Sequence, residues 1–165
     1  MRVFLFLLLL PIGVSAQSAG HEWMLDDLRT CFAAEDIGAK RDCIGQASNA
    51  CQEAEEGGYS TLGMSMCNND EYEAWDVLLN EQYKLTMAAF KGMDVDEGEY
   101  FSSFAVRVES LRDAQRAWIA FRDAECTLEY AIWGSGSMRN IAGSACYVDM
   151  TAQRTIDLWA MREEY

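Results

Sequence analysis

The segment from residue 104 to residue 132 constrains the fold most, because its apolar residues recur at the spacing of one helix face. These residues are Phe104, Val108, Leu111, Ala114, Trp118, Phe121, Leu128 and Ile132. Polar residues share that face within about 60° of Trp118, namely Gln115, Arg122, Glu125 and Glu129. An unpaired buried charge costs several kcal/mol. We therefore predict a helix with a buried polar cluster, whose partners come from other segments.

Periodicity and composition predict an all-α fold for the rest of the chain. The sequence contains a single proline, Pro11, and is rich in residues that favour helices. Helical spacing predicts helices over residues 22–35, 40–55, 64–90, 99–133 and 142–163. We expect a Gly/Ser turn over residues 134–137 and an exposed acidic loop over residues 92–98, with Asp94, Asp96 and Glu97, followed by Glu99. We expect one domain of antiparallel helices that ends in a helical hairpin.

Six cysteines favour disulfides, and six allow 15 pairings. Cys126 and Cys146 are equidistant from residue 136, so a hairpin that turns there predicts a bridge between them. The other four most simply pair locally, as Cys31–Cys43 and Cys51–Cys67, although the sequence alone leaves this pairing open. Zinc binding is the competing interpretation. It is disfavoured because the chain has one histidine and no Cys-x-x-Cys.

The first sixteen residues have the three features of a signal peptide. Met1-Arg2 is a basic start, residues 3–10 are apolar, and Val14-Ser15-Ala16 is a small-residue cleavage site. A buried first helix is the alternative. We predict a periplasmic or secreted protein with no membrane anchor once residues 1–16 are removed. A lipoprotein has a cysteine directly after the cleavage site, whereas this chain has Gln17 there.

Charge limits the partners of the mature chain. Without Arg2, 12 basic residues face 27 acidic ones, a net charge of −15. Residues 17–100 account for −13 of this charge and residues 101–165 for −2. Nucleic acid and anionic lipid are poor partners for such a surface. A basic protein is the natural complement, although the acidity also serves solubility.

A polar cluster is the main candidate site. A hairpin that turns at residue 136 sets Trp118 opposite Arg154, and we expect Glu125 first and Asp76 second as the carboxylate bound to Arg122. We also expect Arg154 near Glu125 or Asp76. The full predicted cluster is Asp76, Asn80, Tyr83, Gln115, Trp118, Arg122, Glu125 and Arg154. We interpret it as an interhelical polar lock, and the alternative is a catalytic or ligand-binding site.

No motif in the chain supports catalysis or a cofactor. His21 stands alone, and no serine or cysteine lies in a nucleophile motif. The turn at 134–137 lacks the lysine and preceding strand of a phosphate loop, and the spacing in 92–98 is wrong for an EF-hand. We therefore predict a protein that is not an enzyme, with no catalytic, cofactor-binding or metal-binding residue.

Two sets of residues carry a family resemblance. The first is Gln115, Trp118, Phe121, Arg122, Cys126, Cys146, Thr151, Arg154 and Leu158, and the second is Trp75, Asp76, Leu79, Asn80 and Tyr83. Together they resemble the LprI-like family, which takes its name from a mycobacterial lysozyme inhibitor that, unlike this chain, looks lipid-anchored. The likeness implies a helical domain over 51–163, with 17–50 as a helical extension. It also implies the Cys51–Cys67 pair.

The resemblance and the charge together suggest an exported, disulfide-stabilised binding protein, and a lysozyme-type inhibitor is the sharpest form of this hypothesis. Either the Gly/Ser turn or the acidic segment 94–99 would then enter a cleft. Two alternatives stay open. One is an envelope structural or interaction protein, and the other is a small-ligand binder or enzyme that uses the Arg/Glu cluster.

Overall fold

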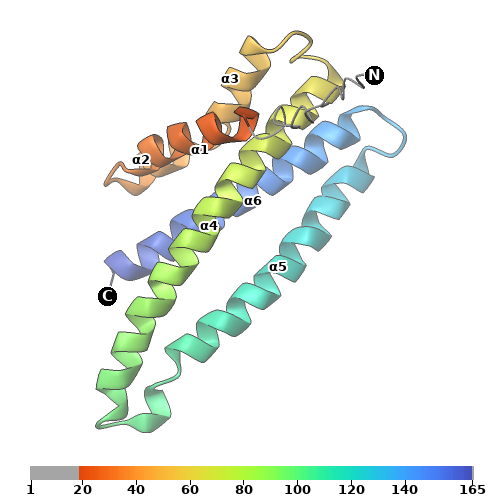
Figure 1. Ribbon diagram of the computed structural model, residues 1–165. Helices are drawn as coiled ribbons and strands as arrows, with labels where there is room; N and C mark the ends of the chain where they lie inside the picture. The colour runs from red at the N-terminus through yellow and green to blue at the C-terminus, as the bar shows by residue number, and fades with distance from the viewer. Residues whose placement is uncertain (1–18, 165) are drawn as a thin grey trace, which may run out of the picture.

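The computed structural model describes residues 19–164, so the predicted signal peptide lies outside the described residues. The described part is helical and contains no strand, which confirms the all-α prediction (Figure 1). Its elements are α1 (Ala19–Phe32), α2 (Ile37–Asp42), α3 (Gln46–Ala54), α4 (Thr61–Gly98), the 3-10 helix η1 (Ser102–Phe104), α5 (Arg107–Ile132) and α6 (Met138–Glu163). None of these helices is long and apolar enough to cross a membrane.

The long helix α4 is the axis on which the other helices pack. It runs beside α6, with α1 to α3 against one end of this pair and α5 along its other side (Figure 1). The main core joins Trp75 of α4 to Ile156 of α6 and Leu28 of α1. A second, smaller core joins Leu79, Leu111 and Leu158 of α4, α5 and α6. The N-terminal helices thus share one core with the predicted hairpin.

The single helix predicted over 40–55 is wrong, because Gly45 divides it into α2 and α3. Gly45 has φ +82°, a left-handed conformation that glycine adopts without steric cost. The buried carboxylate of Glu71 accepts hydrogen bonds from the backbone N–H of Gly45 and of Ser48, both at 2.7 Å, and from Trp75 Nε1 at 2.9 Å. A residue of α4 therefore supplies the N-terminal cap that α3 lacks locally.

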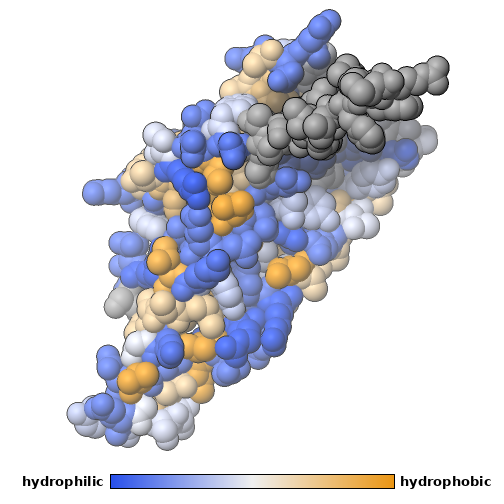
Figure 2. Space-filling view, viewed as in Figure 1, coloured by the Kyte–Doolittle hydropathy of each residue, from blue (hydrophilic) through white to orange (hydrophobic). Residues whose placement is uncertain are grey.

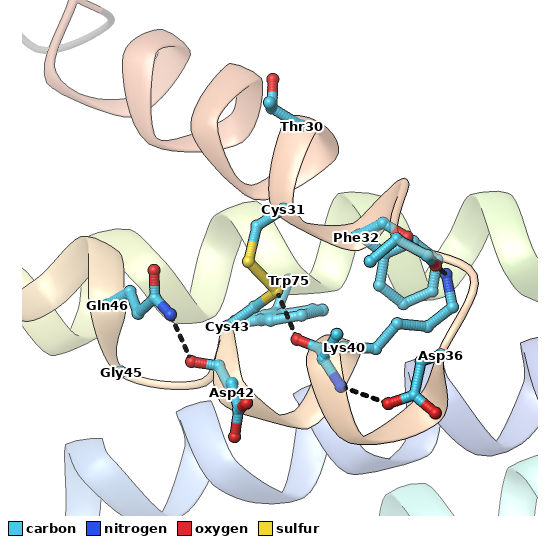
Figure 3. The surroundings of a disulfide bond; sticks show 12 residues. Thr30, Cys31, Phe32, Asp36, Lys40, Asp42, Cys43, Gly45, Gln46 and Trp75 are labelled. Carbon is cyan, nitrogen blue, oxygen red and sulfur yellow. Dashed lines mark hydrogen bonds between the residues drawn. A yellow bond between two sulfur atoms is a disulfide. The ribbon is translucent and has the colours of Figure 1, made fainter.

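Lys40 and the first disulfide hold α2 against α1 (Figure 3). The buried Lys40 ammonium donates to the carbonyl oxygen of Phe32, the last residue of α1, and to that of Ala34, two residues beyond it. It also lies 4.3 Å from the ring centre of Phe32 and 4.1 Å from that of Trp159. A cation at a helix C-terminus satisfies the free carbonyls and the helix dipole, so this buried lysine has a structural role.

The acidic loop predicted over 92–98 is wrong, because α4 continues to Gly98. The Asp94 carboxylate accepts hydrogen bonds from the backbone N–H of Arg107, at 3.1 Å, and of Val108, at 2.9 Å. Asp94 therefore caps α5, which begins at residue 107 and not at 99. Burial alone would raise the pKa of Asp94, but these N–H groups and the Arg107 guanidinium outweigh it and lower that pKa.

All three predicted disulfides are present: Cys31–Cys43, Cys51–Cys67 and Cys126–Cys146. The last joins α5 to α6, with Cα atoms 5.4 Å apart, and confirms the C-terminal helical hairpin. The final helix begins at Met138, one turn earlier than predicted. The cysteines are therefore bridges and not zinc ligands, and no group of acidic, histidine or cysteine side chains within the described chain is arranged to hold a metal ion.

The apolar face predicted for α5 is wrong in part, because Leu111 is buried and Val108 and Trp118 are half-buried but the remaining large residues are exposed. Phe104 lies in η1, before the helix begins, and Phe121, Leu128 and Ile132 are each more than half exposed, like Phe104. The buried residues of α5 form a narrow stripe, namely Leu111, Gln115, Arg122 and Cys126. The reason is packing, since α5 is the outer helix and contacts α6 and α4 along one seam only. A helix used in this way buries a narrow strip and leaves large side chains outside.

Candidate functional site

Arg122 lies at the centre of the predicted cluster and is 8% exposed. Its Nε and Nη2 donate to Asp123 Oδ1 at 3.0 and 2.9 Å, and its Nη1 lies 4.0 Å from Asp76 Oδ1. The expectation that Glu125 binds Arg122 is wrong, because the neighbouring Asp123 takes that place. Adjacent residues on a helix point in different directions, but the arginine side chain is long enough to reach the carboxylate of the next residue.

Three aromatic rings surround the Arg122 guanidinium. Its central carbon lies 5.1 Å from the ring centre of Trp118, 5.5 Å from that of Tyr72 and 5.4 Å from that of Tyr147. Tyr72 and Tyr147 also contact each other, with ring centres 5.3 Å apart. Burial raises the pKa of Tyr72, and the positive charge of Arg122 partly opposes this effect. Arginine stacks well on aromatic faces, so the rings hold the guanidinium from α4, α5 and α6.

Arg154 extends the cluster along α6. Its Nε donates to Gln115 Oε1 at 3.0 Å, and its central carbon lies 5.9 Å from the ring centre of Trp118, which is the predicted contact across the hairpin. Within residues 19–164, the expected pairing of Arg154 with Glu125 or Asp76 is absent. Burial lowers the pKa of Arg154, with the charge of Asp157 opposing it, and Nη2 is buried without a hydrogen-bond partner in the described chain.

Asp76, Asn80 and Tyr83 lie on the α4 side of a groove between α4 and α5. Asn80 Nδ2 donates to the Asp76 side chain at 3.0 Å and to the Asp76 carbonyl at 2.7 Å. The groove has a volume of about 400 Å³ and is lined by Asp76, Leu79, Asn80, Tyr83, Arg112, Gln115, Arg116, Ile119 and Arg122. Its outer arginines pair with acids of their own helix: Arg112 with Glu109 at 2.7 Å and Arg116 with Asp113 at 3.6 Å.

Glu125 lies outside the cluster, in a separate hollow between α5 and α6. It lines an open hollow of about 570 Å³ between the outer faces of α5 and α6, together with Phe121, Glu129, Ala142, Ala145, Cys146, Asp149 and Met150. The structure thus gathers seven of the eight predicted residues along the seam between α4, α5 and α6. It adds Tyr72, Tyr147 and Asp123, which sequence reasoning missed. Tyr72 shares the helical stripe of Trp75 and Tyr83, which was the available signal.

The arrangement joins three helices through side chains of α4, α5 and α6. Arg154 donates to Gln115, and Arg122 donates to Asp123. The carboxylate of Asp76 accepts a hydrogen bond from Asn80 and lies 4.0 Å from Arg122. No serine, cysteine or histidine lines the groove. The fold and this cluster define a disulfide-stabilised helical domain with an arginine and aromatic cluster between three of its helices.

The chain belongs to the LprI family. The family model described as "Lysozyme inhibitor LprI" matches residues 51–158, from Cys51 in α3 to Leu158 in α6, so the resemblance inferred from the sequence is confirmed. The chain is also similar to "Uncharacterized protein R02472" of Rhizobium meliloti (strain 1021), with 35% identity over 104 residues that cover 63% of this chain and 75% of that protein. No solved structure matches the chain.

Proposed function

We propose that the protein is an exported inhibitor of a lysozyme-type glycosidase and that it has no catalytic activity of its own. The observation that carries the proposal is the match of the lysozyme-inhibitor family model to residues 51–158, which include α4, α5 and most of α6. The cluster is consistent with a non-catalytic role, because within the described chain Arg122 binds Asp123 and lies near Asp76, and Arg154 donates to the Gln115 side chain.

Export is supported by the three disulfides. Disulfides persist in oxidising compartments, such as the periplasm and the extracellular space, and are rare in the cytosol. Each of the six cysteines takes part in one bridge, and no free cysteine remains among the described residues. The signal-like residues 1–16 agree with this location, so we place the mature protein in the periplasm or outside the cell.

Charge supports a basic protein as the partner. Lysozymes are mostly basic, whereas this chain has a formal net charge of −14. Opposite charges on two proteins accelerate their encounter, and this steering weakens as salt screens the charges. Residues 17–100 hold most of the negative charge. We therefore expect this half of the chain to determine the association rate.

The test is lysozyme turnover on purified cell walls in the presence of the purified mature protein. The assay is run at low salt and at about 0.15 M salt, where exposed charges are screened over about 8 Å. An acidic protein of similar size and charge serves as the control, because charge alone slows lysozyme at low salt. Inhibition that exceeds the control and persists at the higher salt supports the proposal. Inhibition that only equals the control contradicts it.

A further inference from the structure

The connection between α4 and α5 is an exposed apolar projection, which we call the aromatic tip and define as residues 99–106. It lies at the end of α4 far from α1 to α3, at the bottom of Figure 1. Tyr100, Phe101 and Phe104 are 78%, 60% and 64% exposed, and apolar residues lie beside hydrophilic ones at this end of the molecule (Figure 2). Neighbouring exposed aromatic side chains are a feature of binding surfaces.

The tip is held in place at both ends. Asp94 of α4 accepts two backbone hydrogen bonds from the start of α5, and the Arg107 guanidinium binds Asp94 at 3.2 Å and Glu97 at 3.3 Å. Between these ends, the Phe101 N–H donates to the Glu97 carbonyl at 2.7 Å, and η1 follows. A loop ordered before binding loses less conformational entropy when it binds. The aromatic rings are thus presented on a fixed backbone.

The apex of the aromatic tip is neutral, and acidic residues precede it in the chain. Residues 100–106, Tyr-Phe-Ser-Ser-Phe-Ala-Val, contain no charged side chain, although the whole chain is strongly acidic. Acidic residues come directly before this neutral apex, namely Asp96, Glu97 and Glu99. Glycosidases of the lysozyme type carry a pair of carboxyl groups in the substrate cleft. A neutral, aromatic apex can enter such a cleft without charge repulsion, while the acids before it face a basic rim.

We propose that the aromatic tip is the segment that enters the substrate cleft of the glycosidase, an inference that rests on the proposed inhibitory function. Substrate sites are concave and lined largely by apolar and aromatic side chains, so a projecting apolar segment is the complementary shape. The same acids disfavour two other occupants. A second copy of this chain would bring Asp96 and Glu99 against identical charges, and an anionic membrane would repel them.

The opposite end of α5 provides a matched comparison. The Gly/Ser turn there is also flanked by exposed apolar side chains, those of Ile132, Trp133 and Met138. However, residues 132–138 contain no acidic side chain, and the next charged residue is Arg139, which donates to the Gly134 carbonyl at 3.3 Å. Both projections are apolar, but three acids, Asp96, Glu97 and Glu99, lie within four residues before the aromatic apex, whereas one, Glu129, lies within four residues before Ile132. A basic partner therefore selects residues 99–106.

The experiment compares inhibition by two double variants of the full mature protein. Phe101→Ser with Phe104→Ser alters the aromatic tip, and Ile132→Ser with Trp133→Ser alters the Gly/Ser end. Loss of central anchor side chains weakens binding at least about tenfold, so we expect this loss in the tip variant and less than about a twofold change in the comparison variant. Circular dichroism melts check that both variants fold.

A charge variant separates steering from anchoring. Asp96→Asn with Glu99→Gln leaves the caps at Asp94 and the Glu97–Arg107 pair intact. We expect a slower association rate and a weaker salt dependence, with little change in dissociation, because exposed charges act mainly on encounter. If the phenylalanine variant is destabilised, Tyr100→Ala carries the test, because this side chain is the most exposed of the three.

Each outcome distinguishes the two proposals. If the tip variant inhibits as strongly as wild type, or if both double variants lose inhibition equally, the tip inference is overturned and the proposed function is left intact. Absence of specific wild-type inhibition overturns both. Size-exclusion chromatography tests whether a second copy of the chain occupies the tip. A wild-type dimer that becomes monomeric in the tip variant would make the tip a self-association surface and overturn its assignment to a cleft.

Discussion

Replacement of Arg122 by alanine is expected to destabilise the protein through lost ring contacts more than through a lost ion pair. The side chain of Asp123 is 51% exposed, so its two hydrogen bonds from Arg122 stabilise the fold by about 0–1 kcal/mol. Asp76 is also partly exposed and lies 4.0 Å away. Water can hydrate both carboxylates after the substitution. The larger cost of orphaning a fully buried charge does not apply here.

The aromatic surroundings determine most of the effect. Each of the three rings at 5.1 to 5.5 Å contributes about 0.5–1 kcal/mol as a cation–π contact. The substitution also removes two methylene groups of the arginine stem, Cγ and Cδ, which contribute about 0.8 kcal/mol each when buried. Removal of the guanidinium also recovers part of its desolvation cost. We expect the free energy of unfolding to fall by about 2–4 kcal/mol, which lowers Tm by about 5–15 °C for a chain of this size.

Thermal and urea denaturation of four proteins test this reasoning: wild type, Arg122→Ala, Arg122→Lys and Asp123→Asn. Lysine retains the positive charge but lacks the planar face that stacks on rings, so we expect it to recover less than half of the loss. Asp123→Asn should cost less than about 1 kcal/mol. If Asp123→Asn and Arg122→Ala lose equal free energy of unfolding, the ion pair holds Arg122. If Arg122→Ala has the same Tm as wild type, the cluster does not stabilise the fold.

Three further predictions concern single contacts. Asp94 has a lowered pKa in the folded protein, so its cap stabilises the protein fully above the ordinary carboxyl pKa of about 4. This stabilisation is lost as the pH falls through the folded pKa. The Tm difference between wild type and Asp94→Asn should therefore be largest near neutral pH and vanish at about pH 2. Glu71→Leu leaves buried N–H groups unsatisfied and should cost at least about 1–3 kcal/mol in urea denaturation. Cys126→Ser with Cys146→Ser opens the hairpin bridge and should cost about 3 kcal/mol in the same assay.

The Cys126–Cys146 bridge and the hairpin were predictable because they follow from local chain geometry, whereas the pairing of the other four cysteines stayed open from the sequence alone. Cys126 and Cys146 lie at equal distances from one turn, and antiparallel helices then set them opposite each other. The same register correctly places Trp118 beside Arg154. Such pairings need only the position of a turn and the helical repeat, and both can be read from the sequence.

The exposed and buried sides of α5 were not predictable from periodicity alone. A hydrophobic face indicates burial only when enough partners cover it, and α5 is an outer helix. Phe121 therefore lies outside while Gln115 lies inside. The acidic stretch near Asp94 was misread for a related reason, because local composition suggested a loop. Its carboxylate is used instead by the start of a helix thirteen residues later.

The bridges also have a simple order along the chain. Each cysteine is joined to the next one in sequence, first with second, third with fourth and fifth with sixth, so no bridge encloses or crosses another. A chain that enters an oxidising compartment from its N-terminus would therefore reach its native connectivity by joining cysteines as they emerge. We expect oxidative refolding of the reduced protein to proceed without a disulfide isomerase. Acid-trapped intermediates that contain only neighbouring pairs would be the signature of this route, in which the order of the cysteines alone specifies the covalent structure.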